Sequence, residues 1–324
     1  MPKAVVCREL GPPERLRLET FASAPLAKGQ VRIAIHAAGI NFPDILMAAG
    51  EYQLKPELPF TPGVEAAGEV IEVNDAAGVA VSDKVIVKMR HGAYADEAVV
   101  APSQLVPLPS SFDYAEGATF LAAHGTAYHA LIDRGQVQSG EVLLVHGAGG
   151  GVGLAAVEIG KMLGATVIAA ASSEEKLAVA QARGADHLVL YGREPFRDAV
   201  KRITDGRGAD VVFDPVGGEI FENSLRCIAW GARILVVGFT GGIGLARTNL
   251  VLIKGASVLG VRAGEAVRKN PALGEVRIKA LTEWAEAGKV RPNISHRLLL
   301  EDYAQAMRLL IDRKAIGRVA LMMR

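Results

Sequence analysis

The sequence predicts an α/β protein in which a doubly wound parallel sheet is joined to a second, mainly β domain. The first observation is the stretch 141–153, where a short apolar run is followed at once by a glycine-rich turn and then by apolar residues at helical spacing. The second is the alternation of strand-like and helix-like segments from there to residue 262. The third is the N-terminal region up to about residue 120, where Pro and Gly closely separate short apolar runs, as in strands joined by turns.

The N-terminal region contains one clear strand pattern. Val31, Ile33 and Ile35 alternate with more polar neighbours, which predicts a strand with one buried face. Residues 123–133 then read as a helix that leads into the glycine-rich unit. We therefore expect the first domain to be interrupted after residue 122.

The middle of the chain predicts a parallel sheet. Helices fill the gaps between its strands, except that 239–247 reads as a glycine-rich loop before a short helix near 248–254. Strands joined by helical crossovers form a parallel, doubly wound sheet. The strands that we expect are 141–145, 165–171, 186–190, 209–214, 232–238 and 256–262.

The C-terminal tail, from residue 263, predicts two helices near 271–288 and 301–313 and a final strand at 317–322. We expect this tail to return to the first domain. The predicted division is therefore a discontinuous catalytic domain, 1–122 with 263–324, and a nucleotide-binding domain, 123–262.

Composition and charge exclude several classes of protein. Half of the 324 residues are hydrophobic, 22% are charged, and the net charge is +1 with the basic residues scattered, which argues against a nucleic-acid partner. The two cysteines, Cys7 and Cys227, lie in separate apolar runs and predict no disulfide framework. We find no signal-like N-terminal segment and no apolar run near the ~18–20 residues of a membrane span. These features predict a cytoplasmic protein with no membrane partner.

The glycine-rich turn predicts a phosphate site. It reads Ala-x-Gly-x-x-Gly between an apolar strand and a helix, and unpaired N–H groups at a helix start attract phosphate. Gly150 would let the backbone approach a pyrophosphate, and Gly153 would let the helix pack on the strand. A ligand-free strand–helix turn remains the alternative, because the first position holds Ala148. The expected contacts are Ala148, Gly149, Gly150, Gly151, Val152 and Gly153.

The end of the second predicted strand indicates which dinucleotide binds. An NAD site normally places Asp or Glu there, on the ribose 2′-hydroxyl, but here the strand ends at Ala171. Ser172, Ser173 and Lys176 follow, and hydroxyls with a cation favour a 2′-phosphate, so we expect NADPH. In the alternative interpretation Lys176 is a solvated helix residue and the serines only cap the helix, with Ser172 and Glu175 forming a capping box.

Several motifs together resemble the medium-chain dehydrogenase/reductase family, specifically its zinc-free NADPH:quinone oxidoreductase branch. The likeness covers essentially the whole chain and implies a Rossmann domain with a mainly β, GroES-like catalytic domain. The residues that carry it are 3–6, 11–14, 39–44, 50–52, 62–68, 148–153 and 317–321.

The resemblance also addresses zinc. Zinc-dependent members carry Cys, His and Cys where this chain has Asn41, Val64 and Ala122. A catalytic zinc needs three nitrogen, sulfur or oxygen ligands, so we expect no metal. Without a Lewis acid, alcohol oxidation is disfavoured, and hydride transfer to a quinone or an activated alkene is favoured.

The resemblance implies further cofactor contacts. Asn41 and Thr126 would lie on the nicotinamide side, and Tyr191 would join Ser172 and Lys176 at the 2′-phosphate. Surface packing remains an alternative role for Tyr191, and loop packing for Phe239. The other implied contacts are Val216, Gly238, Phe239, Thr240 and Arg318.

Tyr52 is the implied general acid. It matches a tyrosine of related enoyl-thioester reductases that protonates the carbon next to the carbonyl after hydride arrives. In the alternative, Tyr52 only shapes the cleft. Asp44 also matches a family position, either acting on substrate or holding its loop.

The sequence thus predicts an NADPH-dependent enzyme that transfers hydride to a quinone. Reduction of an enoyl-CoA or another α,β-unsaturated carbonyl is the alternative activity, and a structural or RNA-binding role is the alternative from another class. By resemblance we expect a homodimer in which residues 256–262 pair with their counterpart in a second copy, which would cover an apolar edge strand.

Overall fold

The computed structural model describes residues 1–323 and consists of two compact units. Unit 1 contains residues 1–122 and 291–323, and unit 2 contains residues 123–290. Each has its own sheet and hydrophobic core. The predicted class, a parallel doubly wound sheet with a second, mainly β domain, is confirmed.

The sheet of unit 2 has six parallel strands in the order β10-β9-β8-β11-β12-β13. The order reverses direction between β8 and β11, and in open α/β sheets ligands bind at the carboxyl edge of such a switch point. All six predicted strands are present, and β12 begins four residues earlier than expected. Their bounds are β8 Val142–Val145, β9 Thr166–Ala171, β10 His187–Leu190, β11 Ala209–Asp214, β12 Ile228–Val236 and β13 Ser257–Gly260.

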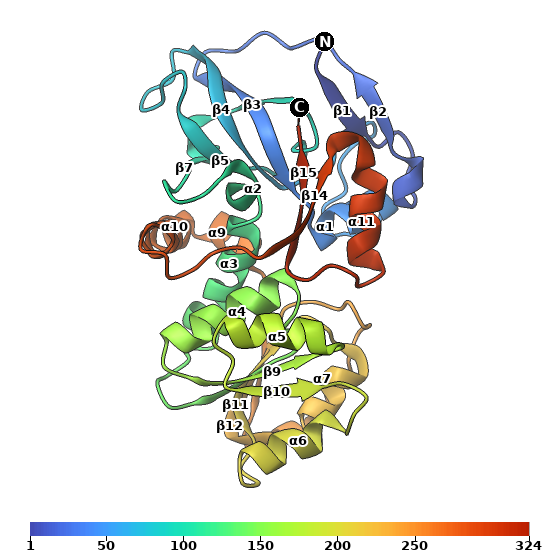
Figure 1. The fold of residues 1–324 in the computed structure, drawn as a ribbon, viewed down its shortest axis with the longest axis vertical. Coiled ribbons are helices and arrows are strands. Elements are labelled where there is room, and N and C mark those ends of the chain that lie inside the picture. Colours follow the sequence, from blue (N-terminus) through green and yellow to red (C-terminus); the bar gives the residue numbers. More distant parts are fainter. Residues whose placement is uncertain (324) are drawn as a thin grey trace. The chain divides into compact units, whose positions relative to one another are not determined.

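Helices cover both faces of this sheet (Figure 1). On one face α4 packs closely, since a Cβ at its Gly160 would meet the side chains of Leu143 and Val167. On the other face Phe196 and Phe221, from α6 and α7, join the core with Leu144. The helix bounds are α4 Gly151–Met162, α5 Glu174–Ala182, α6 Phe196–Ile203, α7 Gly218–Ser224, α8 Thr248–Lys254, α9 Ala263–Lys269 and α10 Pro271–Glu286.

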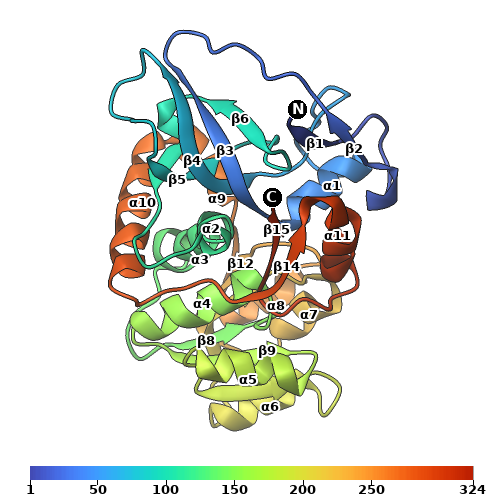
Figure 2. The same ribbon diagram turned by 45° about the horizontal axis from the view of Figure 1, so that its top comes forward.

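The main sheet of unit 1 has the order β14-β15-β3-β4-β5-β7, with β6 also paired to β3. Figure 2 shows β15, from the end of the chain, beside β3 from its beginning. The predicted strand is confirmed as β3, with Val31, Ile33 and Ile35 buried. The strand bounds are β1 Lys3–Val6, β2 Arg17–Thr20, β3 Gln30–Gly39, β4 Glu65–Asn74, β5 Lys84–Lys88, β6 Glu97–Val100, β7 Leu105–Pro107, β14 Ile294–Leu299 and β15 Arg318–Met322.

Short helices connect these strands. The helix α1 follows β3 directly, and its C-terminal end is closed by Gly50 at φ 76°. The helix expected at 123–133 is present as α3 followed by a π-helical stretch, His129–Arg134. The α-helix bounds are α1 Phe42–Ala49, α2 Tyr114–Gly117, α3 Leu121–Tyr128 and α11 Tyr303–Ile311.

The second predicted domain boundary, at 262/263, requires correction, because the units divide at Val290/Arg291. Arg277 in α10 is 5% exposed and donates to Asp133 Oδ2 at 3.1 Å and to the carbonyl of Ala263 at 3.4 Å. Trp284 contacts the ring of Tyr128 at a centroid distance of 5.6 Å. These contacts join α9 and α10 to unit 2, and only the last part of the tail returns to unit 1.

Within residues 1–323, no helix combines the length and the apolar composition needed to cross a membrane.

Candidate functional site

The glycine-rich turn follows β8 and ends where α4 begins, with Gly150 as the N-cap of the helix. Gly147 has a φ of 56°, in the left-handed region that favours glycine. A Cβ at Gly153 would collide with the carbonyl oxygen of Gly147 and lie 2.8 Å from the Cα of Ala148, so the helix packs directly on the turn. The N–H groups in the first turn of a helix have no acceptor within the helix, and this end of a helix attracts anions. This cradle fits a phosphate.

The end of β9 presents the polar groups expected for the adenosine side. Ala171 is buried and carries no charge. Lys176 Nζ donates to Ser172 Oγ at 3.3 Å. The helix cap is one residue later than predicted, because Ser173 Oγ accepts from the N–H of Lys176 at 3.3 Å and is the N-cap of α5. A cation and two hydroxyls therefore lie together at the carboxyl edge of the sheet.

Tyr191 follows β10, and its hydroxyl is directed toward a buried histidine. Tyr191 Oη lies 2.7 Å from His146 Nδ1, and His146 Nε2 lies 2.9 Å from Ser224 Oγ. Since Ser224 Oγ donates to the carbonyl of Ile220 at 2.7 Å, it accepts from His146 Nε2–H, and Nδ1 is left to accept from Tyr191. Burial lowers the pKa of His146 to about 3 and raises that of Tyr191, so both stay neutral. The structure thus gives the Tyr191 hydroxyl an internal partner, and its predicted contact with the 2′-phosphate stays a prediction.

The segments that follow β11 and β12 lie side by side at the same edge. The carboxylate of Asp214 accepts from the N–H groups of Val216 at 2.8 Å and Gly217 at 2.9 Å, which fixes the turn after β11. A Cβ at Gly238 would lie 3.0 Å from the carbonyl oxygen of Pro215, so the two segments are in close contact. Burial raises the pKa of Asp214, opposed by these two hydrogen bonds.

Apart from Thr126, the predicted cofactor residues of unit 2 therefore follow one edge of one sheet, from β10 across to β12. Gly238, Phe239 and Thr240 lie at the β12 end of this edge, where Thr240 Oγ1 donates to the carbonyl of Pro215 at 3.2 Å and Phe239 is 54% exposed. Thr126 lies in the same unit on α3, partly exposed.

A buried charged cluster lies in unit 1 at the start of α1. Arg318, 7% exposed, is paired with Glu65 and donates to Asn41 Oδ1 at 2.9 Å. Asn41 Nδ2 donates to Glu65 Oε1 at 3.2 Å, and the N–H of Ala122 donates to Glu65 Oε2 at 2.9 Å. The Arg318 guanidinium therefore has hydrogen-bond partners within unit 1. Its predicted contact with a cofactor stays a prediction.

Asp44 is fully buried beside this cluster. Its Oδ2 accepts from the hydroxyl of Tyr94 at 2.7 Å and from the N–H of Asn41 at 2.9 Å, whereas Oδ1 has no hydrogen-bond partner. Burial raises the pKa of Asp44 to about 7, against the effect of both hydrogen bonds; nearby Glu65 raises it further and Arg318 lowers it. Asp44 is thus placed to hold the loop around Asn41.

Tyr52, the predicted acid, lies just after α1 and is half-buried against the core of unit 1. The sequence did not indicate the partners of Asn41 and Asp44, namely Glu65, Arg318 and Tyr94. Glu65 follows Val64 in one of the motifs above, but nothing local to the sequence pairs it with a residue 253 positions away.

The positions that would carry zinc ligands converge, since Asn41 and Ala122 both contact the carboxylate of Glu65, next to Val64. An amide, an apolar side chain and a methyl group are not a donor set for zinc. Among residues 1–323 no three His, Cys, Asp or Glu side chains are grouped so as to hold a metal ion. Independence of the activity from metal stays a prediction.

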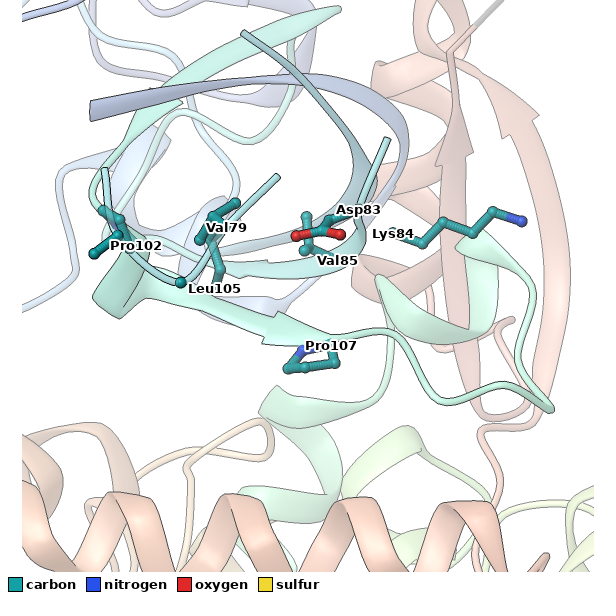
Figure 3. A pocket seen from close by; sticks show the side chains of 9 residues that line it. Val79, Asp83, Lys84, Val85, Pro102, Leu105 and Pro107 are labelled. Atoms are coloured by element: carbon teal, nitrogen blue, oxygen red, sulfur yellow. The ribbon is translucent and has the colours of Figure 1, made fainter. Parts of the chain in front are cut away.

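A shallow pocket of about 410 Å³ lies elsewhere in unit 1 (Figure 3). Figure 3 shows Val79, Leu105, Pro102 and Pro107 along it, with the Lys84 side chain extending away. Asp83, its acidic residue, accepts from the N–H of Ala80 at 2.8 Å and so holds a turn. None of the predicted site residues lines this pocket, and we assign it no part in the function.

Both units of the chain match known protein families. Residues 27–110 match the family of alcohol dehydrogenase GroES-like domains, and residues 151–276 match the zinc-binding dehydrogenase family. The "quinone oxidoreductase-like protein 2 homolog" of Nematostella vectensis is 38% identical over 98% of this chain and 88% of its own length. The chain belongs to the zinc-free quinone oxidoreductase branch of the medium-chain dehydrogenase/reductase family. Human quinone oxidoreductase is 31% identical over 99% of this chain and 98% of its own length.

Solved structures of medium-chain reductases agree with this membership. A quinone oxidoreductase from Pseudomonas syringae superposes with a TM-score of 0.90 at 29% identity, covering 99% of this chain and all of that one. A mycobacterial protein in complex with NADPH gives a TM-score of 0.91 at 26% identity, covering 99% of both chains. The JamJ enoyl reductase superposes with a TM-score of 0.87 at 27% sequence identity, covering 100% of this chain and 99% of that one. As a member of this medium-chain branch, the protein is an oxidoreductase.

Proposed function

We propose that this oxidoreductase uses NADPH to reduce a quinone, without zinc. The observation that carries the choice of NADPH is the end of β9, where Lys176 and Ser172 lie together and the last residue of the strand is Ala171 and not an acid. An acid there would repel a 2′-phosphate, and the cation with its two hydroxyls attracts it. The choice of acceptor is supported by the quinone oxidoreductases among the relatives and by a donor set that does not suit zinc.

In this proposal each segment along the carboxyl edge of the unit 2 sheet binds a different part of the cofactor. The N–H groups at the start of α4 bind the pyrophosphate, and Gly153 keeps the helix close enough to present them. Lys176, Ser172 and Ser173 bind the 2′-phosphate. A reduced nicotinamide cofactor, when bound, supplies the hydride. Reduction of a quinone by one hydride and one proton gives the hydroquinone, and water can deliver the proton to the oxygen.

In unit 1 the buried cluster has a positioning role. Asn41, proposed to lie on the nicotinamide side, is held through its amide by Arg318 and Glu65 and through its backbone N–H by Asp44. A fixed polar group needs no reorganisation when the substrate binds. We assign Asp44 to positioning, because its carboxyl group is fully buried.

The deciding experiment is an acceptor screen with NADPH and with NADH, following loss of the reduced-nicotinamide absorbance. We expect the highest kcat/KM with NADPH and a quinone, unchanged by a chelator. Faster turnover of an enoyl-CoA would replace the proposed acceptor, and equal use of both cofactors would contradict the NADPH preference. Stoichiometric zinc with loss of activity on chelation would contradict the zinc-free mechanism.

Reduction of an activated alkene is the second candidate, favoured by Tyr52 and the similarity to a solved enoyl reductase. Hydride addition to an enoyl thioester leaves an enolate carbon that must be protonated. Tyr52→Phe should therefore lower kcat/KM for the alkene by about 10²–10⁴-fold and have little effect on a quinone. Tyr114→Phe, which alters another tyrosine of unit 1, is the control. A small and equal loss on both acceptors would mean that Tyr52 only shapes the cleft.

The homodimer is also proposed, with β13 as its contact. This strand is at the end of the sheet order and pairs only with β12 among the described residues. Exposed apolar side chains lie on β12 and α8, the elements before it: Trp230 is 79% exposed, Leu252 80% and Ile253 64%. A second copy paired along β13 would cover this edge. Light scattering at micromolar concentration should give twice the mass of the chain, and a monomer would contradict the proposal.

A further inference from the structure

Gly149, in the glycine-rich turn, lies directly against the side chain of Lys176. A Cβ built on Gly149 would lie 2.5 Å from Lys176 Cβ, 2.6 Å from Cγ and 3.0 Å from Cδ. Non-bonded carbon atoms are normally 3.5–4.0 Å apart, so no side chain fits at position 149 while Lys176 keeps its place. Gly149 is accordingly buried, although it lies in a surface turn.

The backbone conformation does not explain why position 149 is a glycine. Gly147 needs a φ of 56°, but Gly149 is not among the residues with positive φ. Gly153 excludes a Cβ because backbone atoms lie in the way. At Gly149, in contrast, the three nearest atoms all belong to the Lys176 side chain. The absence of a side chain at position 149 therefore leaves room for the Lys176 side chain, whereas the backbone conformation of the turn does not require a glycine there.

The contact determines where the Lys176 ammonium lies. The atoms against Gly149 are at the near end of the side chain, and Cβ is fixed by the backbone of α5, so rotation of the far end cannot relieve a collision. The backbone of Lys176 is itself held by the Ser173 cap, and its Nζ lies 3.3 Å from Ser172 Oγ. A side chain at 149 must therefore move the start of α5 away from the turn and carry the ammonium with it.

We propose that Gly149 is a specificity-determining residue for the cofactor. It leaves the space in which the aliphatic part of Lys176 packs, and so holds the ammonium at the 2′-phosphate position between α5 and the phosphate-binding turn. A packed side chain also loses less conformational entropy on binding. This inference rests on the proposed use of NADPH, because it assigns a second residue to the same discrimination.

The test measures binding of two small probes by calorimetry, without catalysis. The probes are 2′,5′-ADP and 5′-AMP, which differ only in the 2′-phosphate, and the readout is the ratio of their Kd values. Lys176→Met, which keeps most of the aliphatic chain and removes the charge, should lower this preference about tenfold or more. Gly149→Ala should lower it by a comparable factor, with little effect on 5′-AMP. In the double variant the alanine should cause no further loss of preference, because no charge remains to be displaced.

Gly150→Ala is the matched control from the same turn. Its Cβ would meet only the carbonyl oxygen of Gly147 at 3.3 Å and would not touch Lys176, so the ratio of the two Kd values should stay unchanged. Because the added methyl group hinders the approach of the backbone to the phosphate that both probes share, both should bind more weakly by the same factor. An unchanged ratio in Gly149→Ala would overturn the role of Gly149 while the NADPH preference remains. If the wild-type protein binds 2′,5′-ADP and 5′-AMP equally well, the NADPH preference is wrong and the inference about Gly149 fails with it. This outcome is seen with the wild-type protein alone.

Should Gly149→Ala fail to fold, the same idea is tested by combining it with Lys176→Gly, which removes the atoms that collide. Recovery of the folded state in this pair supports the proposal. If the pair also fails to fold although Lys176→Gly alone folds, some other part of the turn needs the glycine, and the proposal is wrong.

Discussion

Two networks of buried polar side chains, one in each unit, differ in their charge. In unit 1 the cluster around Asn41 contains a carboxylate and a guanidinium, Glu65 and Arg318, each less than a tenth exposed. In unit 2 the chain of hydrogen bonds under the glycine-rich turn joins Tyr191, His146 and Ser224, all of them neutral. Both lie beside predicted site residues, one next to the proposed nicotinamide contact and the other below the phosphate-binding turn.

Because one network is charged and the other is neutral, their stabilities should depend on pH to different degrees. A buried ion pair is stable only while both charges and their hydrogen bonds are present, because a charge left alone in the interior is costly. In the neutral chain every donor meets one acceptor, from Tyr191 to His146 to Ser224 to the carbonyl of Ile220. Since the pKa of His146 is lowered to about 3 by burial, this chain does not change its charge between pH 5 and 8. We therefore expect the Asn41 cluster to respond to pH and to the loss of a charge, and the neutral chain to respond weakly to both.

The largest expected effect is that of Arg318→Met. It leaves Glu65 buried without its cation, and it also removes the donor to Asn41. Loss of one partner of a buried pair typically costs about 3–5 kcal/mol of unfolding free energy, which urea titration measures.

Two controls sharpen this prediction. Arg308→Met breaks the exposed pair with Glu14 in the same unit and should change the unfolding free energy far less. Combining Arg318→Met with Glu65→Gln removes both charges and should recover part of the loss. A single variant as stable as the wild type would show that the pair does not hold unit 1 together.

The second prediction uses Asp44. Its pKa is raised to about 7 in the folded protein by burial, whereas an unfolded aspartate titrates near pH 4. The folded state therefore binds more protons than the unfolded state between about pH 4 and 7, and the free energy of unfolding falls as the pH rises through this range.

Asp44→Asn removes this titration and keeps an oxygen acceptor for Tyr94 and the N–H of Asn41. Because Glu65, Arg318 and Tyr94 surround Asp44, the comparison is made between variant and wild type at each pH. We expect the variant to gain roughly 2–4 kcal/mol relative to the wild type between pH 4 and 8. Parallel pH profiles would mean that the pKa of Asp44 is the same in the folded and unfolded states.

Much of the fold followed from local patterns. The six strands of unit 2 are apolar runs between helices and were all predicted, because a buried parallel strand shows its hydrophobicity in its own residues. The strand β14 was missed, since most of its side chains are exposed and it lies at an edge with β15 as its neighbour. The boundary at 262 was misplaced because Arg277 and Asp133 are 144 positions apart, and no local pattern reveals their contact.

The site was predictable where one segment builds it. The glycine-rich turn and the residues after β9 are each a short continuous segment, and the side chain of Lys176 lies against Gly149 of the turn. The partners of Asn41 were not predictable, because Glu65 and Arg318 meet it only through the antiparallel pairing of β3 with β4 and β15. Likewise, the resemblance implied that Tyr191 contacts the 2′-phosphate and gave no sign of His146, because the distance between Tyr191 and His146 depends on the register of three parallel strands.

The smallest expected effect is that of Tyr191→Phe in the neutral chain. The change removes the hydrogen bond to His146 and a contact with the backbone N–H of Gly147, and it leaves an unpaired but uncharged Nδ1. We expect a loss of about 1–2 kcal/mol that is constant between pH 5 and 8. If the hydroxyl has no contact with the cofactor, the ratio of NADPH to NADH affinity stays at its wild-type value. A selective loss of NADPH affinity would instead return this hydroxyl to the 2′-phosphate, as the sequence predicted, and would mean that the His146 contact is exchanged when the cofactor binds. Ser224→Ala, which cuts the same chain at its other end, is the control: it should cost similar stability and leave cofactor choice unchanged in either case.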